Sequence, residues 1–204
     1  MRDHRPERSV DPPDSALCRS AADLLRRTAP APLVAHCHRS YALGAALITN
    51  RCEAYDAEIL FVAAALHDLG LTAAYGHVDA HGFEHVGAAV AADLLRVHGG
   101  DEQRATLVRD AVAMHLELTT GQDPRPEVAA LHVGAAADVL GIGLDRLPDG
   151  LLDDVLQRWP RVGFTAWLSA AMQAEAQRRP ASTAGRYVRE FGFLQMLAAA
   201  EVPA

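Results

Sequence analysis

The sequence predicts an all-α protein with a single helical domain, and three observations lead to this class. Half of the 204 residues are apolar, only 5% are aromatic, and alanine is abundant. Such a composition favours helices that pack closely together. Apolar residues recur at helical spacing along most of the chain, and no convincing alternation of apolar and polar residues indicates a strand. The chain is long enough to bury a substantial core.

The helices are expected between segments that contain proline or glycine. The charged, proline-containing residues 1–14 are expected to form a flexible segment, and residues 15–204 the helical domain. Helix breaks are indicated at Pro30-Ala31-Pro32, at Gly70 and from Gly121 to Pro126. The predicted helices are Ser15–Thr28, His36–Arg51, Tyr55–Leu69, Phe83–Val97, Asp101–Leu118, Glu127–Leu140, Pro148–Trp159, Phe164–Arg178 and Thr183–Ala199.

Two helix starts and one loop carry more specific expectations. Asp101 is predicted to cap its helix, and Pro148 to occupy the first turn of another. The segment Leu71–Gly82, which contains His77 and His81, is interpreted as a loop over a functional site, because loops of this length in compact domains are often functional.

The composition argues against several classes of function. A net charge of −7 speaks against a general nucleic-acid surface, although a few arginines could still hold a nucleotide. No stretch approaches the roughly 20 apolar residues of a membrane span, and the N-terminus has no apolar signal core. Cys18, Cys37 and Cys52 show no CxxC spacing, which indicates free thiols. We therefore expect a cytoplasmic protein without nucleic-acid or membrane partners.

The adjacent pair His67-Asp68 is the most informative feature of the chain. It follows the apolar run from Ile59 to Leu66, which should be buried, and burying ionisable groups is costly without partners. A divalent metal ion would compensate, because imidazole and carboxylate are good ligands for Zn, Fe or Mn. On a helix the two side chains lie about 100° apart, so they converge most easily at a helix end. The alternative is a buried, hydrogen-bonded pair.

Further candidate ligands lie on other predicted helices. His36 shares a helix face with apolar residues and, taken alone, could be a core histidine bonded to the backbone. Asp138 lies deep in a helix of small apolar residues, where a charge requires a partner. His38 is rotated by about 200° from His36, and His132 by about 120° from Asp138, so both are weaker candidates.

Three polar residues are candidates for moving a proton. His115 lies in an apolar helix and could be a ligand, a donor to a ligand or a core histidine. Glu84 and His85 begin a helix directly after the predicted loop. Glu84 could simply cap that helix, or the pair could act as acid, base or substrate clamp. The remaining histidines His77, His81 and His98 are interpreted as solvated.

The order of these residues resembles that of the HD-domain metalloenzyme superfamily: a lone histidine, a His-Asp pair and a distant aspartate on helices. The context Ala64-Ala65-Leu66-His67-Asp68-Leu69-Gly70 is similar to the family signature. The resemblance implies an HD-type helical bundle with one divalent metal ion, Zn or Fe ahead of Mn, bound by His36, His67, Asp68 and Asp138. Members that bind two metal ions have two additional histidines as ligands. His85 and His115 could be these two histidines, although Phe83 stands where the first of them is expected.

The second half of the chain is similar to the cyanamide hydratase branch of this superfamily. The segments that carry this similarity are Phe83–Ala88, Trp159–Phe164 and Arg178–Thr183, with Arg179 in place of the usual lysine. The resemblance implies metal-assisted addition of water to a small nitrile-like substrate of the cyanamide type. Glu84, His85 or His115 would then move the proton.

Three other functions stay open. A phosphohydrolase acting on a nucleotide or phosphate ester needs basic groups near the metal. Arg39, Arg161, Arg178 and Arg179 are candidates, although a solvated surface charge is the usual role of an arginine. A di-iron oxygenase would need His85 and His115 as ligands, and a non-catalytic sensor or assembly module would use a metal only for stability. A homo-oligomer is expected from base rates alone.

Overall fold

The computed structural model describes residues 11–49, 51, 54–78 and 81–203, and within these ranges the secondary structure is helical, with no strand. The predicted all-α class is therefore confirmed. The helices are α1 (Ala16–Thr28), α2 (Ala31–Thr49), α3 (Ala57–Leu66), α4 (Phe83–Val97), α5 (Glu102–Met114), α6 (Pro126–Leu140), α7 (Leu151–Arg158), α8 (Phe164–Arg178), α9 (Thr183–Glu190) and α10 (Phe193–Ala199). Short 3₁₀ turns are η1 (Leu69–Leu71), η2 (Thr120–Gln122) and η3 (Leu144–Arg146).

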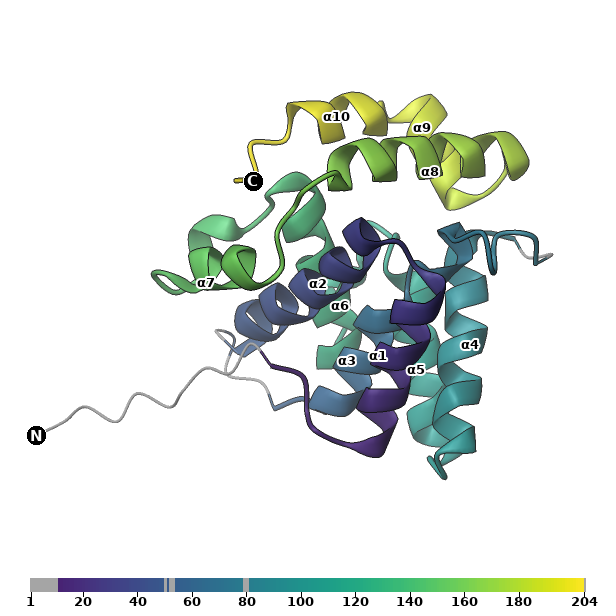
Figure 1. Ribbon diagram of the computed structural model, residues 1–204, viewed down its shortest axis with the longest axis vertical. Coiled ribbons are helices and arrows are strands. Elements are labelled where there is room, and N and C mark those ends of the chain that lie inside the picture. The colour runs from purple at the N-terminus through teal and green to yellow at the C-terminus, as the bar shows by residue number, and fades with distance from the viewer. Residues whose placement is uncertain (1–10, 50, 52–53, 79–80, 204) are drawn as a thin grey trace, which may run out of the picture.

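Helix α3 forms the centre of the main bundle. Every residue from Ile59 to Leu66 is buried, as expected for a helix that is apolar on all sides. Helices α1, α2, α5 and α6 pack around it, and α4 pairs with α5 at one side (Figure 1). Because α3 is surrounded by other helices, the His67-Asp68 pair that follows it lies in the interior of the protein.

Two glycines allow α2 and α6 to cross in close contact. A Cβ atom on Gly134 would lie 2.1 Å from the carbonyl oxygen of Ser40. A Cβ atom on Gly44 would lie 2.3 Å from the carbonyl oxygen of Ala130. Both distances are far inside van der Waals contact, so only glycine fits. The crossing brings the helices that carry His36 and Asp138 together.

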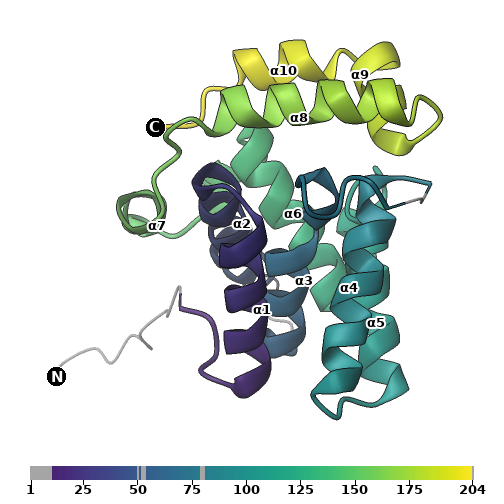
Figure 2. The ribbon, with the colours of Figure 1, turned by 45° about the vertical axis from the view of Figure 1, so that its right-hand side comes forward.

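The three C-terminal helices form a second layer across one end of the bundle. Figure 2 shows α8, α9 and α10 lying over the ends of the bundle helices. An apolar cluster lies within this layer and at its contact with the start of α4; its buried members are Phe83, Phe164, Leu168, Met172, Ala184, Phe193 and Leu197. The layer therefore covers the end of the bundle at which α3 stops.

Several predicted helix boundaries are confirmed and others are wrong. Helices α4 and α8 have the predicted limits, and Asp101 caps α5 by accepting a hydrogen bond from the Arg104 backbone N–H at 2.8 Å. Helix α2 begins at Ala31, because a proline in the first turn needs no backbone donor. Pro148 precedes the first residue of α7 and is not in its first turn. The predicted helix Thr183–Ala199 is divided by Gly192, whose φ of +64° ends the helical path.

Other predictions are settled in part. Cys18 and Cys37 are buried free thiols, as expected, whereas Cys52 and residues 1–10 lie outside the described residues. In the described part of the chain, no helix has the length and apolar character needed to cross a membrane.

Candidate metal centre

The His67-Asp68 pair lies where α3 ends against the start of α4. His67 is the C-terminal cap of α3, and its Nδ1–H donates to the carbonyl oxygen of Ala64 at 2.8 Å. Close packing fixes the backbone here, because a Cβ atom on Gly87 would lie 2.4 Å from the carbonyl oxygen of Leu66. The helix end thus holds both polar side chains in place, in agreement with the position predicted for them.

Three buried histidines share one hydrogen-bonding pattern. The Nδ1–H of His36 donates to Asp138 Oδ2 at 2.6 Å, and the Nδ1–H of His115 donates to the carbonyl oxygen of Val112 at 2.6 Å. His67 uses its Nδ1–H in the same way. An acceptor at Nδ1 selects the tautomer in which Nε2 carries a lone pair. All three rings therefore offer an Nε2 lone pair for another partner.

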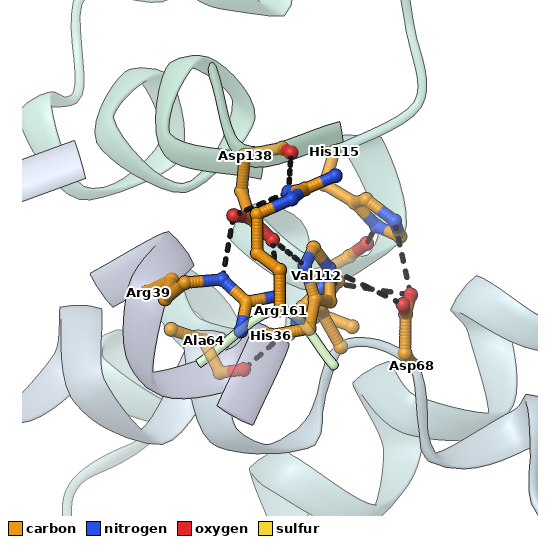
Figure 3. A network of polar contacts seen from close by, with 9 residues as sticks. His36, Arg39, Ala64, Asp68, Val112, His115, Asp138 and Arg161 are labelled. Carbon is orange, nitrogen blue, oxygen red and sulfur yellow. Dashed lines mark hydrogen bonds and ion pairs between the residues drawn. The ribbon is translucent and has the colours of Figure 1, made fainter. Parts of the chain in front are cut away.

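These nitrogen atoms converge with Asp68. His36 Nε2 lies 3.2 Å from His67 Nε2 and 3.6 Å from Asp68 Oδ2. Asp68 Oδ1 lies 3.4 Å from His67 Nε2. It lies 3.6 Å from His115 Nε2 (Figure 3). His36, His67 and Asp68 offer ligand atoms that all lie within 4.8 Å of one another. Facing lone pairs repel unless a cation lies between them, so this donor set fits a divalent metal ion.

Asp138 contacts the opposite side of the His36 ring. Its carboxylate accepts from His36 Nδ1, from Arg39 Nε at 2.7 Å and Nη2 at 2.9 Å, and from Arg161 Nη1 at 2.9 Å. A carboxylate offers about four lone-pair sites, and these four contacts use them. The direct binding of the metal by Asp138 stays a prediction. In this arrangement Asp138 orients the His36 ring, as carboxylates commonly do behind a ligating histidine.

Arg39 and Arg161 were expected to be solvated surface charges, but both are buried in the structure. Arg39 is fully buried, and Arg161 is nearly so. Arg39 Nη1 also donates to the carbonyl oxygens of Trp159 and Pro160, at 3.0 Å each. The Phe164 ring stacks on His36 at 4.5 Å, and each guanidinium lies 5.1 Å from the same ring. The charge of Asp138 inside an apolar helix was the one signal that pointed to such partners.

Burial determines the protonation of the site. It lowers the pKa of His67 to about 3, helped by the neighbouring His36, and the pKa of His115 to about 3, helped by His67. Burial raises the pKa of Asp68, against the opposing effect of His36 and His115. For Asp138 burial also acts to raise the pKa, but the contacts with His36 and Arg39 outweigh it and lower the pKa. His67 and His115 are therefore neutral, which is the form of imidazole that binds metals.

The centre opens into a mostly apolar cavity of about 370 Å³ between the bundle and the C-terminal layer. His36, His67, Asp68 and His115 form the polar end of its lining, and the lining also includes the polar residues His132 and Tyr187. Further lining residues come from α4, from the segment after α5, from α6 and from α8–α10; they include Phe83, Leu116, Val139, Leu168, Met172, Tyr187 and Phe193. A small molecule in this cavity would meet the candidate metal centre.

Glu84 and His85 lie outside the lining of this cavity. Glu84 is buried, and its Oε2 has no hydrogen-bond partner among the described residues. The His85 side chain is 48% exposed, and its Nε2 lies 3.9 Å from Glu84 Oε1. A role of Glu84 or His85 in proton transfer stays a prediction, and the position of these residues outside the cavity lining does not support it. None of the described residues of the predicted loop Leu71–Gly82 lines the cavity either.

The two weaker histidines have structural partners. His38 stacks on Trp159 with ring centres 3.8 Å apart, and burial lowers its pKa to about 4. His132 lines the cavity, and its Nδ1–H donates to the carbonyl oxygen of His115 at 2.8 Å. His132 thus supports the segment that carries His115.

The fold and the site together define an all-helical protein with a buried candidate metal centre. Two proteins of Saccharomyces cerevisiae, cyanamide hydratase DDI2 and cyanamide hydratase DDI3, are similar in sequence. Each is 24% identical over 179 residues, which cover 86% of this chain and 80% of the relative. No family model matches the chain. The chain is thus distantly homologous to cyanamide hydratases over most of its length.

Proposed function

We propose that the protein is a metal-dependent hydratase that adds water to a small nitrile-like substrate of the cyanamide type. The observation that carries the proposal is the convergence of His36, His67 and Asp68 at the closed end of a cavity. The distant homology to cyanamide hydratases supports the same reaction. The water oxygen bonds to the nitrile carbon, both water hydrogens end on the product, and no group leaves.

His36, His67 and Asp68 would hold the ion, and Zn and Fe suit this donor set best. When bound, a divalent ion lowers the pKa of water from 15.7 towards about 7 and polarises a nitrile nitrogen. This chemistry needs no charge on the substrate. It therefore agrees with a cavity in which the remaining lining is mostly apolar.

We assign proton handling to His115. His115 Nε2 and Asp68 Oδ1 lie 3.6 Å apart at the edge of the cluster. Burial lowers the pKa of His115 to about 3, so the ring is neutral and its Nε2 can accept a proton. The apolar side chains of Phe83, Leu168 and Met172 limit the access of bulk water.

Phosphoester hydrolysis has less support. Arginines usually hold phosphate groups, but the described lining contains neither arginine nor lysine. Arg39 and Arg161 are engaged with Asp138, and Arg178 and Arg179 with Glu175. A di-iron centre also has less support, because the exposed His85 is not among the converging side chains.

The test combines metal analysis with two assays. Elemental analysis of the purified protein should give about one divalent ion per chain, and the loaded protein should convert cyanamide to urea without releasing phosphate from nucleotides. The variants His67→Ala and Asp68→Ala should lose metal and hydration together. His77→Ala is the control, because His77 is exposed and lies outside the cavity. Full metal content in His67→Ala would contradict the assignment of ligands.

His115→Gln separates proton handling from metal binding. We expect this variant to keep most of its metal while kcat falls by about 10²-fold or more, the usual size of a general acid–base contribution. Loss of metal in step with activity would instead make His115 a ligand.

A further inference from the structure

The cavity is much larger than a cyanamide-type group requires. Its volume is about 370 Å³, whereas a cavity of about 150 Å³ lined by apolar side chains already holds benzene. Cyanamide has about half as many non-hydrogen atoms as benzene. Most of the space would therefore stay without partner atoms if cyanamide were the natural substrate, and empty apolar space forfeits contacts.

The polar and apolar parts of the cavity are separated. The ligand-type atoms belong to the cluster of His36, His67, Asp68 and His115. The rest of the described lining is apolar except for His132 and Tyr187, and the Tyr187 hydroxyl already donates to the carbonyl oxygen of Leu116. Apart from His132 Nε2, this described part of the lining offers no group that would pair with a charge or with several hydrogen-bonding groups on a ligand.

The apolar lining continues to the surface. Leu118 and Ile142 line the cavity and are also 74% and 55% exposed, so they lie where the cavity opens. A molecule that is longer than the cavity is deep would still contact apolar side chains at this opening. The size, the lining and the opening all favour an uncharged ligand with an extended apolar part.

We propose that the natural substrate is a nitrile or cyanamide with an apolar alkyl or aryl substituent of roughly ten non-hydrogen atoms. This inference rests on the proposed function for the identity of the reacting group. The cavity itself predicts the class of the substituent, which is neutral, apolar and large. The reacting group contacts the histidine cluster, and the substituent lies against α6 and α8–α10.

The first experiment compares substrates and products on the metal-loaded wild-type protein. The substrates are cyanamide, N-butylcyanamide and N-benzylcyanamide, and kcat/KM is measured for each. Each methylene buried from water contributes about fourfold to binding, so the larger compounds should exceed cyanamide by at least tenfold. Calorimetric titration with urea and N-benzylurea, the hydration products, gives a readout without turnover, and N-benzylurea should bind at least tenfold more tightly.

A cavity-filling variant locates the substituent. Ala136 lines the cavity on α6, so Ala136→Leu should lower the ratio of kcat/KM for N-benzylcyanamide over cyanamide by at least fivefold. Ala170→Leu is the matched control, because Ala170 is exposed on α8 and does not line the cavity. This control should leave the ratio unchanged.

The two proposals fail in different ways. If N-benzylurea binds no more tightly than urea and cyanamide is the best substrate, the substituent class is overturned while the hydratase function stands. If N-benzylurea binds tightly but none of the cyanamides is hydrated, the cavity assignment stands and the hydratase function is overturned. The wild-type measurements decide both questions even if Ala136→Leu does not fold.

Discussion

Each histidine at the centre has one ring nitrogen bonded to a fixed acceptor and one left for a further partner. The acceptors are a backbone carbonyl for His67 and His115 and the carboxylate of Asp138 for His36. Asp138 is in turn held by two buried arginines, so the orientation of His36 depends on an ionic network rather than on one bond. The charge of Asp138 is needed twice, for the arginines and for His36.

Asp138→Asn should therefore be strongly destabilising although it preserves the shape of the side chain. It leaves the buried Arg39 and Arg161 without their counter-charge, and breaking a buried ion pair from one side costs about 3–5 kcal/mol. Urea denaturation measures the free energy of unfolding. Asp93→Asn is the control, because its pair with Arg96 is exposed and should contribute at most about 1 kcal/mol. Equal losses in the two variants would show that the buried network has no special role.

His67 and His115 predict a pH dependence for the metal-free protein. Their pKa of about 3 when folded lies below the ordinary value of 6.5, so between these limits the unfolded chain binds more protons. The free energy of unfolding then falls as the pH falls, and the slope for each of these two histidines rises to about 1.4 kcal/mol per pH unit as the pH goes well below 6.5. The raised pKa of Asp68 acts in the opposite direction and reduces the net slope.

Urea denaturation of the chelator-treated protein between pH 7 and 5 measures this slope. His115→Gln should reduce the slope by about one proton, whereas the exposed His77→Ala should leave it unchanged. An identical slope in wild type and His115→Gln would contradict the assignment of a neutral, buried His115.

Sequence reasoning found the polar residues of the centre but not all their partners. His67-Asp68 stood out because an ionisable pair followed an apolar helix, and His36 and Asp138 because each lay among apolar residues. Helical periodicity shows that a side chain faces inward, but it does not show which atom it meets. The contact of Asp138 with Arg39 and Arg161 depends on how α2, α6 and the segment before α8 pack, which no local pattern records.

Helices could be predicted where their ends carry local signals. Helix α4 follows Gly82, and α8 follows Gly163, and both limits were predicted correctly. Helix α5 ends at Met114 rather than Leu118, because the chain turns at His115 to place its ring beside Asp68. A tertiary contact thus overrides the helical propensity of the following residues.

The close contact between α2 and α6 predicts whether Gly134→Ala raises or lowers the free energy of unfolding. Helical propensity alone would make Gly134→Ala stabilising by about 1 kcal/mol. The new Cβ atom would instead lie 2.1 Å from the Ser40 carbonyl oxygen, so the helices must separate, and we expect a loss of about 1–3 kcal/mol. Urea denaturation gives the sign directly, and the metal content should fall because His36 moves with α2. A gain in stability would contradict the close crossing.

On the scale of the complete fold, the cavity exists because the C-terminal layer lies over the end of the bundle (Figure 2). The sequence predicted the helices of this layer but not its position, since an apolar face does not identify the surface that it covers. Arg179 forms one of the polar links between the layer and the bundle. Its Nη2 donates to the carbonyl oxygens of Gly76 and Val78, at 3.1 and 2.6 Å, and its Nη1 contacts both oxygens of the buried Glu175.

Arg179→Lys should loosen this link, because one ammonium group cannot span a carboxylate and two carbonyl oxygens. We expect a loss of about 1–3 kcal/mol in the free energy of unfolding and at least tenfold faster hydrogen exchange at the amides of residues 72–78. Arg178→Lys is the matched control, because Arg178 is half-exposed and its contact with Glu175 is 3.4 Å long. Its effect should stay within about 0.5 kcal/mol. Similar exchange rates in the two variants would show that the Arg179 contacts do not hold the loop, because Arg179 and not Arg178 donates to the loop carbonyls.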